Sequence, residues 1–257
     1  MTRTARSILA AAVLYILVAA PGMLRADEKH PLTAAQREKI EMKWTAELEA
    51  AEQTVEKTPD DVNAYSRRGD AHFFLGHFAE AVADYDKMAE LDADHDASHW
   101  RRGIAWFYAE NYDEAAGQFE RYHSFDDVDR ENGIWRYLSQ HKAKGQKTAR
   151  QGLLKYKKDD REPFPSVYRL FAGEIEPQEI LDAIDKAEIS DVEREKRLFY
   201  AELYIGLNAA VEDEPDVVLT HLHQAVKNTW APTAGYGPHY MWQVGRLHYE
   251  LLSREKK

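Results

Sequence analysis

Apolar residues recur every three or four positions along most of this chain, which is the spacing of one face of an α-helix. The first such stripe ends at residues 58–61, where Pro59 cannot continue a helix. No segment alternates apolar and polar residues for long enough to predict a strand. We therefore expect an all-α protein. The first stripe consists of Ile40, Trp44, Leu48, Ala51 and Val55.

The second half of the chain predicts further helices, separated by proline and glycine. Apolar residues around 134–138 and at 153–154 indicate a helical pair that is broken at Gly145. Pro177 occupies a position that is favourable in the first turn of a helix. The last stripe follows Pro238 and ends in a polar tail. The other expected helices cover 167–171, 177–187, 197–207, 217–227 and 238–253.

Two segments match when the chain is compared with itself at a shift of 34 residues. Gly69 then aligns with Gly103, and Ala81 aligns with Ala115. Small residues at these places let two helices of a pair approach closely, while aromatic residues fill the space beside them. Over residues 62–125 this period and pattern resemble the tetratricopeptide-repeat (TPR) family. The other aligned pairs are Arg68 with Arg102, Phe78 with Tyr112, Glu80 with Glu114, and Tyr85 with Phe119.

The TPR resemblance implies a solenoid of stacked helical hairpins with a concave face, because each hairpin leaves an apolar side that only a neighbour can cover. We predict one helical domain over 27–257. It would contain clear repeats at 62–125 and degenerate helical pairs at 131–230. The helix at 238–253 would cap the array.

Segments inside and outside the clear repeats resemble the NlpI-type TPR lipoproteins of the bacterial cell envelope. The resemblance spans roughly 60–252, and it implies an adaptor that docks envelope proteases and cell-wall hydrolases, often as a homodimer. Those lipoproteins are anchored through a lipidated cysteine. This chain has no cysteine, so we expect no lipid anchor. The segments that carry the resemblance are 102–105, 107–108, 135–138, 173–175, 178–184, 199–204 and 223–228.

The N-terminus has the order of a secretory signal. Arg3 and Arg6 precede the apolar run 8–20, and a small residue follows at Ala26. We predict a signal peptide at 1–26 and a periplasmic or secreted protein. The alternative is an uncleaved membrane anchor, because Leu24 is an imperfect residue before the cleavage point.

The charge balance disfavours nucleic acid as a partner. The chain has a formal net charge of −11, and loss of 1–26 would remove three arginines and make it more acidic. Nucleic-acid binding draws most of its affinity from clustered Lys and Arg. The absence of cysteine also excludes a disulfide framework and a thiol nucleophile.

The concave face is the predicted site for a protein or peptide partner. Aromatic rings between two arginines fit a peptide that carries apolar side chains and a carboxylate. The alternative is that these rings pack the neighbouring helix. TPR proteins that bind chaperone tails use Lys and Asn where this chain has Ser66 and Asp70, which disfavours that partner. The predicted peptide-binding residues are Arg67, Asp70, Phe74, Trp100, Arg101, Phe107 and Tyr108.

Catalytic and metal-binding patterns are weak, so we predict neither an enzyme nor a cofactor. Ser139 and Lys142 have the Ser-x-x-Lys spacing, but the other motifs of penicillin-binding enzymes do not follow. His95 and His99 lie one helical turn apart, at a turn between repeats where capping residues are needed. Two other functional classes stay open, namely a structural oligomer-forming scaffold without a client and a hydrolase with an unrecognised site.

Overall fold

The computed structural model describes residues 30–158 and 160–255 as an all-α, TPR-type solenoid. The predicted signal peptide at 1–26 lies outside these residues. Within the described ranges there is no strand, as the sequence predicts. None of the helices described is long and apolar enough to cross a membrane.

The helices begin and end where the sequence places caps and breakers. Thr33 caps the first helix through the backbone N–H of Gln36, and Gly76 ends the second in a left-handed conformation. The N-terminal helices are α1 (Ala34–Lys57), α2 (Val62–Leu75), α3 (Phe78–Leu91), α4 (His95–Ser98), α5 (Trp100–Tyr108), α6 (Tyr112–Phe125), α7 (Arg130–Lys144) and α8 (Gln146–Gln151). The remaining helices are α9 (Phe164–Ala172), α10 (Pro177–Lys186), α11 (Asp191–Val211), α12 (Pro215–Lys227), the short 3-10 helix η2 (Ala231–Thr233) and α13 (Tyr236–Glu255).

Close contact within each hairpin depends on a glycine opposite a large side chain. A Cβ added at Gly69 would lie 2.7 Å from Cε1 of Tyr85, and one at Gly103 would lie 2.6 Å from Cζ of Phe119. Gly206 of α11 approaches Leu222 of α12 in the same way. The glycine therefore faces the aromatic or aliphatic residue of the second helix.

The 34-residue register continues into the pair formed by α7 and α8. Arg68 binds Asp84, and Arg102 binds Gln118, across hairpins in which the partners are 16 residues apart. Arg136 makes the equivalent contact with the carbonyl of Gly152. The alanines of the three hairpins, Ala81, Ala115 and Ala149, are all fully buried.

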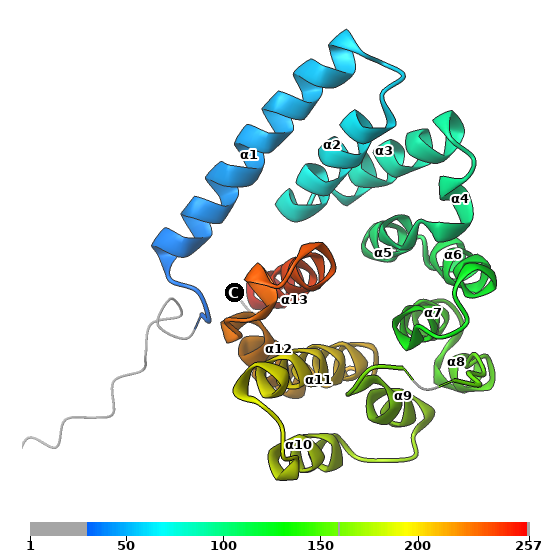
Figure 1. Ribbon diagram of the computed structural model, residues 1–257, viewed down its shortest axis with the longest axis vertical. Coiled ribbons are helices and arrows are strands. Elements are labelled where there is room, and N and C mark those ends of the chain that lie inside the picture. The colour runs from blue at the N-terminus through cyan, green and yellow to red at the C-terminus, as the bar shows by residue number, and fades with distance from the viewer. Residues whose placement is uncertain (1–29, 159, 256–257) are drawn as a thin grey trace, which may run out of the picture.

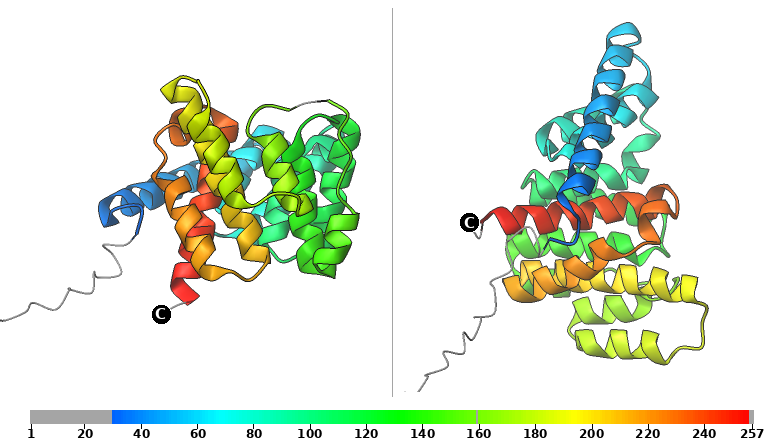
Figure 2. Two further views of the ribbon diagram at one scale, coloured as in Figure 1. Left: turned by 90° about the horizontal axis from the view of Figure 1, so that it is seen from below. Right: turned by 90° about the vertical axis from the view of Figure 1, so that its left-hand side faces the viewer.

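The hairpins follow one another in an arc, and α13 lies inside that arc (Figure 1). The side view in Figure 2 shows α13 running across the middle of the molecule between the N-terminal and C-terminal helices. It packs on α12, which precedes it, and also reaches α2 on the opposite side of the arc. The C-terminal helix thus covers the last pair and fills part of the concave side.

Replacement of Ala115 by Leu should lower the free energy of unfolding by about 1–3 kcal/mol, because the buried site has no space for three more carbon atoms. Chemical denaturation followed by circular dichroism measures this change. Ala46→Leu, at an exposed position of α1, is the matched control and should change stability little. Equal stability of the two variants would contradict the packing described here.

Candidate functional site

The concave side of the N-terminal hairpins is in contact with α13 of the same chain. The ring of Tyr240 lies 4.8 Å from Trp100 and 5.0 Å from Phe74, measured between centroids. The hydroxyl of Tyr108 is 3.0 Å from Nδ1 of His248. These rings therefore pack a neighbouring helix, which is the alternative that the sequence left open.

A buried ion pair joins the two N-terminal hairpins to the start of α13. Nη1 of Arg101 donates to Oδ1 of Asp70 over 2.6 Å and to Oγ of Ser66 over 3.0 Å. The hydroxyls of Tyr85 and Tyr236 also donate to the Asp70 carboxylate, over 2.7 and 2.5 Å. Little of either charged side chain is exposed. Because Tyr236 belongs to α13, this network links α13 to α2 and α5.

The remaining two predicted residues lie apart from α13. Arg67 is exposed on α2. Phe107 is buried and packs edge-to-face on Trp135, with the ring centroids 5.5 Å apart. The structure thus brings five of the seven predicted residues against α13, and peptide binding by the set stays a prediction.

A cavity of about 410 Å³ lies where α13 leaves part of the concave side uncovered; we call it the central cavity. Its walls are mainly aromatic and apolar, and one end carries ionisable side chains. Trp100 is the one predicted site residue among its lining. The aromatic lining is Trp100, Phe119, Tyr122, Trp135, Tyr200 and Trp230, and the ionisable lining is Asp129, Glu131, Arg161 and Lys196.

The ionisable end of the central cavity is built around Arg161. Its guanidinium pairs with Glu131, with Asp129 at 3.4 Å and with Asp160 at 3.2 Å. The hydroxyl of Tyr204 donates to Oε1 of Glu131 over 2.5 Å. Burial raises the pKa of Glu131 to about 7, against the lowering effect of Arg161, and burial likewise raises the pKa of Asp129.

Most of the cavity residues escaped the sequence analysis. A run of acids such as residues 126–129 is typical of a solvated turn. Asp129 instead caps α7, accepting from the backbone N–H of Glu131 over 3.0 Å, and faces Arg161. One signal was present: a further shift of 34 residues aligns Trp135 with the groove positions Arg67 and Arg101. The partners on α11 and α13 have no such repeat signal.

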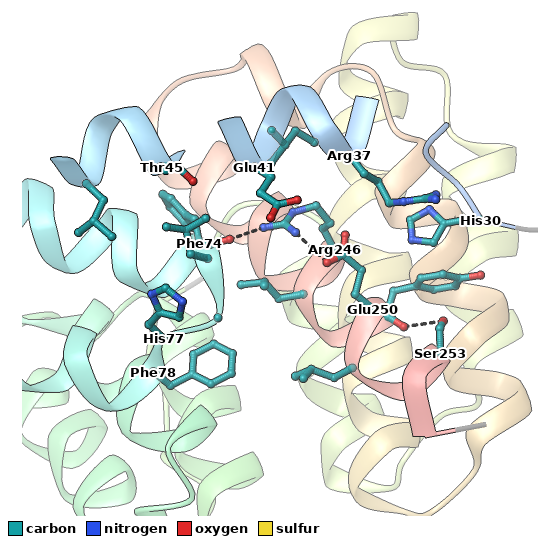
Figure 3. A pocket seen from close by; sticks show the side chains of 17 residues that line it. His30, Arg37, Glu41, Thr45, Phe74, His77, Phe78, Arg246, Glu250 and Ser253 are labelled. Atoms are coloured by element: carbon teal, nitrogen blue, oxygen red, sulfur yellow. Dashed lines mark hydrogen bonds and ion pairs between the residues drawn. The ribbon is translucent and has the colours of Figure 1, made fainter. Parts of the chain in front are cut away.

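A second cavity, of about 580 Å³, lies between α1, the α2–α3 turn and α13. Figure 3 shows Arg246 at its centre, between Phe74 and Glu250. Nη2 of Arg246 donates to the Phe74 carbonyl over 2.6 Å, and Nη1 pairs with Glu250 at 2.9 Å. These contacts fasten α13 to the end of α2, so they have a structural role.

The weak catalytic and metal patterns also have structural roles. Ser139 is fully buried and donates to the carbonyl of Trp135 over 2.8 Å. His99 is buried, and its Nδ1 accepts from the backbone N–H of Arg102 at 3.2 Å. Among the residues that the structure describes, no three potential ligands come together as a metal site.

No known family profile matches the chain. Its similarity to curated proteins is partial. The Protein SGT1 homolog of Bos taurus is 31% identical over 96 residues, which is 37% of this chain and 28% of that protein. The human Protein SGT1 homolog is 33% identical over 91 residues, or 35% of this chain and 24% of that protein. The Hsp70-Hsp90 organizing protein 3 of Arabidopsis thaliana is 28% identical over 102 residues, which is 39% of this chain and 18% of that protein.

The chain therefore spans less than a third of the length of these relatives. The similarity is consistent with the TPR-type fold that the structure shows. It does not extend to the closer resemblance with envelope lipoproteins.

Replacement of Arg101 by Leu should lower the free energy of unfolding by about 3–5 kcal/mol, because it leaves the Asp70 carboxylate buried without its cation. Denaturation of Arg101→Leu, Asp70→Asn and the double variant measures this in a double-mutant cycle. The double variant should be less destabilised than the sum of the single ones. Strict additivity would show that Arg101 and Asp70 do not stabilise each other, which would contradict the ion pair.

Replacement of Glu131 by Gln should change how stability depends on pH. The raised pKa means that folded Glu131 keeps its proton up to about pH 7, whereas the unfolded chain loses it near 4.5. The carboxyl therefore contributes stability below pH 4.5 that is lost as the pH rises to about 7. Urea denaturation between pH 5 and 8 should show Glu131→Gln gaining stability relative to the parent as the pH rises, by at most about 1.4 kcal/mol per pH unit. A difference that is constant with pH would contradict the raised pKa.

Proposed function

We propose that this protein is a TPR-type adaptor that holds a segment of another protein in the central cavity. The observation that supports this function is an aromatic-walled cavity of about 410 Å³, with ionisable side chains at one end, on the concave side of a repeat array. Aromatic and Arg side chains are the residues that most often dominate the energetics of protein–protein contacts. Extended concave surfaces are the usual binding faces of repeat proteins.

The finer proposal is an exported adaptor that docks envelope proteases or cell-wall hydrolases, with a periplasmic or secreted location and a homodimeric state. Its support is the resemblance of residues 60–252 to envelope TPR lipoproteins and the signal-like order of residues 1–26. The partial relatives include a plant protein named for Hsp70 and Hsp90. A chaperone tail remains the less favoured partner, because Ser66 and Asp70 accept hydrogen bonds from Arg101 and offer no cation to a carboxylate.

Photo-cross-linking from two positions of α6 tests the adaptor function. A benzoylphenylalanine at position 122 lies in the central cavity, whereas one at position 125 replaces the exposed Phe125, which does not line it. In cells that express the full chain, we expect a specific product with another envelope protein from position 122 and none from position 125. Products that contain only this chain would favour the structural scaffold, and a chaperone product would contradict the envelope client.

With the cross-linked partner purified, replacement of Trp230 by Ala should weaken its binding by at least about 2 kcal/mol, the scale of an aromatic anchor residue. Isothermal titration calorimetry measures the change. Trp106→Ala is the matched control, because Trp106 is also partly buried but lies outside the cavity, against Arg102. Equal losses for both variants would move the binding site away from the central cavity.

A further inference from the structure

The two cationic side chains of the central cavity, Lys196 and Arg161, already form ion pairs with carboxylates. Nζ of Lys196 pairs with Glu193 at 3.1 Å. Arg161 is surrounded by Asp129, Glu131 and Asp160. An incoming carboxylate would therefore meet one guanidinium that is shared among three acids, and repulsion from those acids opposes its binding.

The carboxylates of the cavity, by contrast, lack full compensation. The pKa values of Asp129 and Glu131 are both raised, because burial penalises their charged forms by more than Arg161 favours them. Their side chains keep 26% and 16% of their exposure, so neither is sealed off from solvent. A second cation entering the cavity would stabilise both ionised carboxylates.

The aromatic walls suit the same cation. Arg161 itself shows the preference, since its guanidinium lies 5.6 Å from the ring of Tyr200, one of the wall residues. Trp100, Trp135 and Trp230 line the remaining wall. Trp is the aromatic residue that binds cations best.

One residue of the same wall also carries a buried N–H group. Trp135 is 2% exposed, and its Nε1 has no hydrogen-bond partner among the described residues. The net charge of −11 adds a long-range attraction for basic partners.

We infer that the central cavity recognises a basic side chain, the alkylammonium or guanidinium of a Lys or Arg in the partner protein. The cation lies between the tryptophan walls and the carboxylates of Asp129 and Glu131. This inference rests on the proposed adaptor function and specifies the chemistry of its client.

Titration of the ¹⁵N-labelled full chain with small probes tests the inference. The probes are butylguanidinium, pentanol and pentanoate, which have similar apolar tails and differ in charge. The indole N–H signal of Trp135, assigned with a Trp135→Phe variant, reports occupancy. At pH 8, where Glu131 is ionised, butylguanidinium should half-saturate this signal at a concentration about fivefold lower than pentanol, and pentanoate should bind more weakly than either.

Two variants separate recognition of charge from a general loss of the cavity. Glu131→Gln should weaken butylguanidinium about fivefold and leave pentanol unchanged, since the amide keeps the shape and removes the charge. Glu212→Gln, a partly buried carboxylate outside the cavity, should change neither. Tighter binding of pentanoate, or no effect of Glu131→Gln on butylguanidinium, would overturn the inference. Cross-linking from position 122 would still report the adaptor function in that event.

Discussion

The contact between Asp70, Arg101 and Tyr236 is the interaction on which the rest of the structure depends. It joins α2, α5 and α13, and Tyr236 lies 166 residues from Asp70. An arc of helical hairpins has contacts mainly between neighbours, so its ends are ordinarily independent. Here a buried charge pair ties the last helix to the first clear hairpin. Because a buried carboxylate without a cation is costly, the position of α13 is strongly specified.

That position also determines which part of the concave side is free. The first residues of α13 and the loop before it supply Trp230, Pro238 and Met241 to the central cavity. The rest of α13 covers Phe74 and Tyr108. The concave side is thus reduced to a local cavity.

The sequence predicts the hairpins well and the placement of α13 poorly. Helical spacing and the 34-residue repeat locate α1 to α6, because both are local patterns. A further shift of 34 residues aligns Arg136 with Arg102 and Ala149 with Ala115. The third hairpin could therefore also have been predicted from the sequence. The stripe of Tyr240, Val244 and Leu247 shows that α13 has a buried face, but many surfaces could cover such a face. The contacts of α13 with Asp70, with Arg101 and with the Phe74 carbonyl select one.

The chemistry of the cavity could not be predicted from the sequence, for a related reason. Asp129 follows a run of acids at a turn, where solvated carboxylates and helix caps are the usual interpretation, and it is in fact the cap of α7. Its second role arises because Arg161, in the connection between α8 and α9, reaches both Asp129 and Glu131. Glu131 in turn receives the hydroxyl of Tyr204 from α11. Each of these residues has an ordinary local interpretation, and their joint chemistry exists only because the arc curves far enough to bring α7, α11 and α13 around one cavity.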